Sequence, residues 1–150
     1  MTIQISTGLR NKMLDTGSFR SLMNGGKLLI YAGSAPTGAD APATSAGGSL
    51  LCTITTNNTG TGLNFATSAA SGVITKATAD VWSGTNSAGG TPSFYRFVAP
   101  GDTDASSTTQ CRIQGSCDNS GAADLNLTNA PLTSGALQIV DYFSVSLPTL

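Results

Sequence analysis

Residues 49–56 read S-L-L-C-T-I-T-T, and the turn-forming run T-N-N-T-G-T-G begins where they end. Positions 50, 52 and 54 carry Leu, Cys and Ile, and they alternate with Leu, Thr and Thr at 51, 53 and 55. A period of two is that of a β-strand, and the Asn and Gly residues that follow favour a tight turn. The stretch therefore predicts a strand that ends in a reversal of the chain.

The same pattern extends outward in both directions. Turn-forming clusters such as S-G-T-N-S-A-G-G and P-G-D-T-D separate the runs, and no alternation of strands with helices suggests a parallel sheet. We predict an all-β protein, an antiparallel sandwich or barrel of jelly-roll or immunoglobulin-like type with about eight or nine short strands. The other expected strands lie at 27–33, 63–66, 73–77, 79–83, 93–98, 110–115, 123–127 and 136–147.

Only residues 6–23 show helical spacing of apolar residues. Ser6 or Thr7 can cap a first helix, Gly17 breaks the pattern, Ser18 can cap a second helix, and N-G-G at 24–26 ends it. We expect a helical amino-terminal arm over 1–26 and a single β-sandwich domain over 27–150.

Two other segments carry specific expectations. Residues 34–48 are rich in Pro, Ala, Thr, Ser and Gly, which predicts a long exposed loop suited to contacts. The run A-L-Q-I-V-D-Y-F-S-V-S-L from position 136 predicts one long strand near the end of the chain. Its oily face would hold residues 137, 139, 143, 145 and 147, and Asp141 would mark a bend or pair with an Arg.

The composition argues against catalysis. The chain has 150 residues, no His, no Glu, 10% charged residues and a formal net charge of -1. It therefore lacks the usual general base near neutral pH and a Glu pair for glycoside chemistry. No phosphate-binding glycine motif and no G-x-S-x-G elbow occurs. Direct nucleic-acid binding is not favoured, because no stretch of the chain gathers Lys and Arg into a basic stripe. We expect no enzyme activity, no cofactor and no metal.

The remaining polar candidates have plainer interpretations. Asp102 and Asp104 could form a carboxylate pair, but in P-G-D-T-D they are typical acceptors of backbone N–H groups. The segment 118–124, D-N-S-G-A-A-D, resembles a calcium loop but lacks the terminal Glu, so turn chemistry is favoured over a weak cation site. The three cysteines at 52, 111 and 117 are expected to be buried small hydrophobes.

Trp82 and Tyr95 leave two interpretations open. Exposed together, they could form a carbohydrate-binding face. Core packing is the commoner fate of large aromatic residues in a small sandwich. The chain also has no secretory signal and no apolar run long enough to span a membrane, so we expect synthesis in a cytoplasm.

Several stretches resemble small β-rich structural proteins of tailed bacteriophages. They are W-S-G-T-N-S-A-G-G-T-P-S-F-Y-R-F-V at 82–98, G-D-T-D-A-S-S-T-T-Q-C-R-I-Q-G-S-C at 101–117 and A-D-L-N-L at 123–127. The opening S-T-G-L-R-N-K-M-L, the run K-L-L-I-Y-A-G-S-A-P-T-G-A-D-A and the final I-V-D-Y-F-S-V-S-L-P fit the same pattern.

The resemblance implies a virion component without a diagnostic active site. Its expected role is capsid decoration, in which a cement protein bridges capsid subunits. A tail, head–tail adaptor or fibre-tip subunit, with carbohydrate or receptor binding, is the alternative. The resemblance also implies a homo-oligomer, with a trimer favoured, made in the host bacterial cytoplasm and bound to the major capsid protein or other virion subunits. Segments 2–23 and 34–48 are the expected contact regions.

Overall fold

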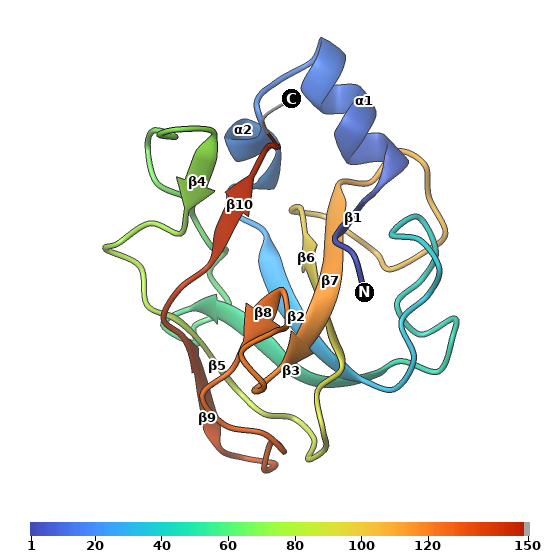
Figure 1. Cartoon of the computed structure of the whole chain (residues 1–150), viewed down its shortest axis with the longest axis vertical. Coiled ribbons are helices and arrows are strands. Elements are labelled where there is room, and N and C mark those ends of the chain that lie inside the picture. The colour runs from blue at the N-terminus through green and yellow to red at the C-terminus, as the bar shows by residue number, and fades with distance from the viewer. Residues whose placement is uncertain (149–150) are drawn as a thin grey trace.

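The computed structural model describes residues 1–148 and confirms the all-β prediction (Figure 1). An eight-stranded sheet has the order β1-β7-β6-β2-β3-β5-β9, and β8 joins it by pairing with β7. All of its strand pairs are antiparallel except β7 with β8. Strands β10 and β4 form a separate two-stranded sheet. The elements are β1 (Gln4–Ile5), α1 (Thr7–Asp15), α2 (Phe19–Met23), β2 (Lys27–Ala32), β3 (Ser49–Thr56), β4 (Val73–Thr75), β5 (Trp82–Thr85), β6 (Phe94–Val98), β7 (Arg112–Asp118), β8 (Leu125–Asn126), β9 (Leu137–Val140) and β10 (Ser144–Ser146).

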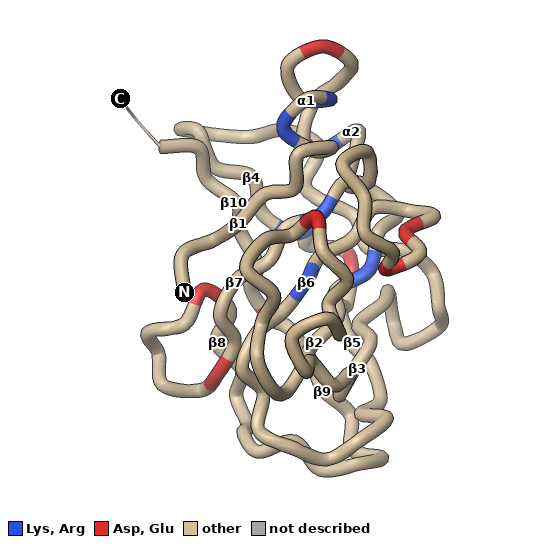
Figure 2. Tube along the Cα trace, turned by 90° about the vertical axis from the view of Figure 1, so that its right-hand side faces the viewer, with Lys and Arg blue, Asp and Glu red and all other residues tan. Residues whose placement is uncertain are grey.

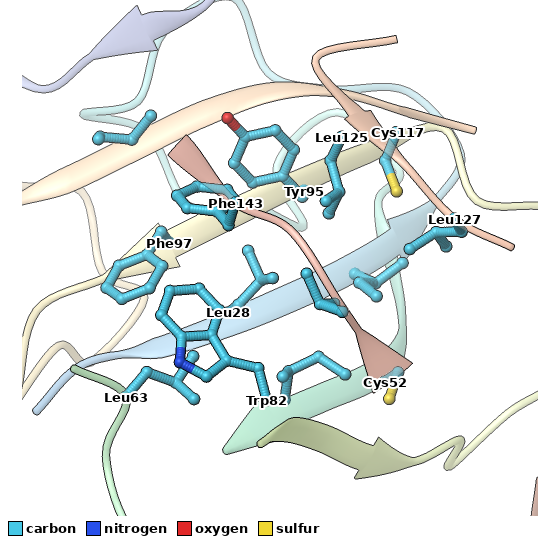
Figure 3. Close-up of a cluster of buried hydrophobic side chains, with 14 of the residues drawn as sticks. Leu28, Cys52, Leu63, Trp82, Tyr95, Phe97, Cys117, Leu125, Leu127 and Phe143 are labelled. Carbon is cyan, nitrogen blue, oxygen red and sulfur yellow. The ribbon is translucent and has the colours of Figure 1, made fainter. Parts of the chain in front are cut away.

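The main core is an aromatic cluster on one face of the large sheet (Figure 3). The ring of Phe143, which follows β9, lies 5.5 Å from Trp82 and 5.7 Å from Tyr95, measured between ring centroids. Phe65 meets Trp82 edge to face at 5.7 Å. Because these rings are large and are buried from water, they supply much of the hydrophobic stabilisation of the fold.

The amino-terminal helices form as their capping residues predict. The Ser6 side chain accepts the backbone N–H of Leu9 at 3.2 Å, and the Ser18 side chain accepts that of Ser21 at 3.1 Å. Leu9 and Met23 are fully buried in the main core. Each of the two helices is therefore anchored in the main core by a buried side chain.

The expected long carboxyl-terminal strand is two strands. Its first part, β9, pairs with β5, and its second part, β10, pairs with β4. Asp141 lies between them and is exposed, and it forms no ion pair with any residue in 1–148. Of the two alternatives for Asp141, a bend or a pair with an Arg, the pair is wrong, and the residue lies in the break between the two strands.

The prediction of a single oily face also fails in β9. Gln138 and Val140 point inward there, whereas Leu137 and Ile139 are exposed. Phe143 then points inward on the far side of the break. Asp141 and Tyr142 both face solvent, which breaks the alternation of the strand. The inward-pointing side chains therefore lie at even positions before the break and at odd positions after it.

Within residues 1–148, none of the helices has the length and apolar character needed to cross a bilayer.

Candidate interaction surface

The edge strand β9 presents large apolar side chains to solvent. Leu137 is 58% exposed and Ile139 is 42% exposed, and Tyr142 just beyond the strand is 68% exposed. Natural proteins usually protect an edge strand with charged residues, proline or a bulge, because its unpaired backbone groups invite association. Here the only charged residue within 125–148 is Asp141. We call Leu137, Ile139 and Tyr142 the β9 patch.

The surroundings of the β9 patch carry little charge. No Lys, Arg or Asp occurs in residues 41–75 or in residues 81–95, which contain β3 and β5. Figure 2 shows the consequence, since the lowest part of the trace, around β9, is free of blue and red. A neighbouring molecule could therefore cover this end while removing few charges from water, and the nearest are Asp141 and Asp124, which line one hollow with Ile139 and Tyr142.

The other face of the large sheet is held by two fully buried arginines, Arg96 in β6 and Arg112 in β7. The Arg112 Nε atom donates to an Asp102 carboxylate oxygen at 2.6 Å, and Arg96 Nη1 lies 3.2 Å from Asp104. Asp102 also accepts the backbone N–H of Asp104 at 2.7 Å. Asp102 thus accepts a backbone N–H group within its own turn, as predicted, and each of the two aspartates pairs with an arginine.

The same two arginines fasten the loop over residues 34–48. Arg96 donates to the carbonyl oxygen of Ala41 at 2.8 Å, and Arg112 donates to that of Ala39 at 3.3 Å. Asp104 accepts the backbone N–H of Ala43 at 2.8 Å. A buried guanidinium needs several acceptors, and backbone carbonyls of the loop supply them.

The loop is therefore only partly exposed, which corrects the expectation of a wholly exposed contact loop. Pro36, Ala39 and Ala43 are buried, whereas residues 44–47 face solvent. Ala43 packs against Tyr31 and Phe94, whose rings stack with centroids 4.9 Å apart. Ala39 and Ala43, which belong to the run that predicted an exposed loop, are small enough to lie directly on the sheet.

The structure decides between the two interpretations of the aromatic residues. Trp82 is 0% exposed and Tyr95 is 2% exposed. They belong to the core, so a carbohydrate-binding face built from them is wrong. Burial raises the pKa of the Tyr95 phenol above its usual value, with smaller contributions from Asp124 and Cys117.

Residues 118–124 form a hydrogen-bonded turn. Asp118 accepts the backbone N–H of Ser120 at 2.8 Å, and Asp124 accepts that of Ser116 at 2.8 Å. Turn chemistry, the favoured interpretation, is confirmed. Among residues 1–148, no three His, Cys, Asp or Glu side chains gather in a way that could hold a metal ion.

The three cysteines are free and buried, as expected. Burial raises the pKa of Cys52 to about 11. Burial, together with the negative charge of Asp118, raises the pKa of Cys117 to about 12. Burial also raises the pKa of Cys111. Because the thiolate is the nucleophile, burial and the raised pKa values disfavour reaction of these thiols at neutral pH in the folded protein.

Sequence reasoning did not anticipate the β9 patch or the arginine pair. The predicted oily face contains Leu137 and Ile139 but not Tyr142, and nothing local in L-Q-I-V reveals that the phase of the strand reverses. A signal for the arginines did exist, because F-Y-R-F-V and C-R-I-Q place one Arg inside each of two apolar strands.

Comparison of the chain with protein-family models, with curated proteins and with solved structures finds no match to any of them.

Proposed function

We propose that the protein is a non-enzymatic structural subunit of a bacteriophage virion. Its role is that of a capsid decoration or cement protein, which stabilises the head by bridging capsid subunits. The observation that carries the proposal is the β9 patch, an apolar sheet edge of the kind that a subunit buries in an assembly.

The size of the β9 patch suits a contact that acts through many copies. Fully burying a Leu or Ile side chain contributes about 1.5–3 kcal/mol, and Leu137 and Ile139 are about half exposed, so each has roughly 1 kcal/mol left to gain. A single such contact is weak. Repeated over a particle and combined with oligomerisation, contacts of this size add through avidity.

The scarcity of charge supports the same role. With a formal net charge of -1, copies of the chain repel one another weakly and can pack closely. The proposed partners are other copies, with a trimer favoured, and the major capsid protein or other virion subunits. Binding only to the assembled shell lowers its free energy relative to separated parts, which is how cement would stabilise a head.

The resemblance to phage structural proteins gives the proposal its biological setting. It spans stretches from both ends of the chain, including the strands that here form β5, β6 and β7. A location on the capsid surface, after synthesis in the host bacterial cytoplasm, follows from the proposed role.

Particles carrying the protein provide the test. We expect electron cryomicroscopy to show regular density on the head that disappears when the protein is stripped and returns when it is added back. Density confined to the tail would contradict the cement role, and absence from every particle would contradict the proposal as a whole.

A matched pair of variants tests the β9 patch in the same experiment. Ile139→Lys places a charge on the patch and should lower rebinding to stripped particles by tenfold or more, about the effect of 1.4 kcal/mol. Ser106→Lys adds the same charge at an exposed position in the loop before β7 and should rebind normally. Equal rebinding of both variants would remove the β9 patch from the interface.

A further inference from the structure

The second layer of the sandwich is too narrow to cover the sheet beneath it. It contains two short strands, β4 and β10, against eight strands in the large sheet. Beside it lies an apolar groove of about 440 Å³. Its lining is formed by apolar side chains of several elements, including Ile5 of β1, Phe19 of α2, Ile74 of β4, Val145 of β10, and Tyr95 and Ile113 of the large sheet.

The free edge of β10 borders this groove. Figure 1 shows β4 on one side of β10 and β1 on the other, and Val145, Ser146 and Leu147 contribute to the lining. Among residues 1–148, the backbone of β10 is therefore paired on the side away from the groove and open on the side toward it.

The hydrogen-bond pattern shows which backbone groups are open. The Lys76 N–H donates to the Phe143 carbonyl and the Leu147 N–H donates to the Gly72 carbonyl, and these two bonds flank the β4–β10 pairs and continue their register. In an antiparallel pair, bonded and non-bonded positions alternate. Ser144 and Ser146 are thus non-bonded positions, and their N–H and C=O groups point away from β4.

One charged residue lines the groove, and it has an unused donor. Arg20 is the only Lys, Arg, Asp or Glu in the lining. Its Nε atom is buried and has no hydrogen-bond partner among the described residues. No described residue forms an ion pair with Arg20, so its guanidinium can bind a carboxylate that enters the groove, and a charge-assisted hydrogen bond is stronger than a neutral one.

We propose that an extended segment of a partner polypeptide adds to the free edge of β10 as a third strand of the second layer. Its backbone pairs with Ser144 and Ser146, every second side chain is apolar and enters the groove, and one Asp or Glu pairs with Arg20. This inference deepens the proposed function, because the partner is a virion subunit only if that function holds. The groove and its open edge stand independently of it.

Three features favour a peptide over a lipid. A fatty acid could place its carboxylate near Arg20 and its chain in the groove, but it offers nothing to the backbone groups of Ser144 and Ser146. A strand satisfies them and fills the groove with side chains at a period of two. An added strand also reinforces a two-stranded sheet, which is marginal by itself.

The test uses the whole protein in solution and a synthetic peptide, Asp-Val-Thr-Val-Thr-Val-Thr, with a fluorophore at its carboxyl end. A strand can add to a sheet edge in the parallel or the antiparallel direction, so the peptide can take whichever direction brings its terminal Asp to Arg20. We expect saturable binding by fluorescence anisotropy and slowed hydrogen exchange at the Ser144 and Ser146 amides. No saturable binding at millimolar peptide overturns the proposal.

Controls separate strand addition from apolar adsorption. Replacing the central Val of the peptide with Pro should abolish binding, and replacing its Asp with Asn should weaken binding to the wild type but not to Arg20→Gln. Ser146→Pro removes an N–H that the fold does not use and should weaken binding about tenfold, whereas Ser146→Ala keeps that N–H and should bind normally.

If Ser146→Pro does not fold, slowed exchange at the Ser144 and Ser146 amides in the wild type still decides the question. Laurate serves as the lipid probe. If it binds and displaces the peptide while those amides remain unprotected, the groove is a lipid site and strand addition is wrong. Peptide binding needs no particle, so it can fail while the cement role stands, or hold while the cement role fails.

Discussion

Removing the Asp102 carboxylate is the sharpest test of how the fold is held together. Its partner Arg112 is fully buried, and the Asp102 side chain itself is only 4% exposed. In Asp102→Ala, the Arg112 guanidinium stays inside the protein without its counter-charge. The carbonyl oxygens of residues 39–41 and 105 and the Gln110 side chain, which also accept from it, are neutral groups.

The expected cost is large for one residue. Breaking a buried ion pair by deleting one partner costs about 3–5 kcal/mol. Asp104→Ala should cost less, because the Asp104 side chain is 34% exposed and water screens its attraction to Arg96. Asp141 is exposed and has no ion pair in the described residues, so Asp141→Ala should change the free energy of unfolding by less than about 0.5 kcal/mol.

Urea unfolding measures these differences. With an m value of about 2 kcal/mol/M, the loss in Asp102→Ala lowers the urea midpoint by roughly 1.5–2.5 M. A double-mutant cycle isolates the cause, because Asp102→Ala should cost far less when Arg112→Met has already removed the buried charge. The reasoning is refuted if Asp102→Ala costs the same in both backgrounds or is no worse than Asp141→Ala.

Three further predictions concern the packing and the buried groups. Gly8→Ala should destabilise the protein by about 2 kcal/mol or more, because its new Cβ would lie 2.4 Å from the Thr109 carbonyl carbon. The control Gly38→Ala, whose new Cβ would meet no described atom within 4 Å beyond its chain neighbours, should be nearly neutral in the same urea assay. Phe143→Ala should cost about 3–5 kcal/mol by opening a cavity between the aromatic rings, and thermal unfolding that matches the wild type would contradict this. The pKa of Cys52 is about 11 in the folded protein against an ordinary 9.0, so the unfolded chain loses this proton at lower pH. The free energy of unfolding should therefore fall as the pH rises from about 9 to 11. Cys52→Ala should flatten this decline, and an unchanged slope would show that the thiol does not cause it.

Local signals accounted for the elements whose geometry is set within a few residues. Ser6 and Ser18 cap helices because their side chains reach N–H groups three positions on, a contact that any chain with that sequence can make. The apolar run at 27–33 and the alternating run at 49–56 likewise became β2 and β3. For these segments the residues themselves predict the structure.

What lies between the strands depended on residues distant in the sequence. Loop 34–48 is fastened by Arg96 and Arg112, and no feature of the loop announces guanidinium groups more than fifty positions away. The strand predicted at 63–66 forms only isolated bridges, such as the one between Phe65 and Lys76. These outcomes rest on pairings that exist only after distant parts of the chain have met.

The sequence by itself determined an all-β domain with two capped helices and a surface poor in charge. These properties follow from composition and from contacts between near neighbours. Only the tertiary structure decided which side of β9 faces water, where β10 leaves an open edge, and that Trp82 is buried. The alternation of a strand shows that its two faces differ, but which face is buried depends on the strand it pairs with and the layer that covers it.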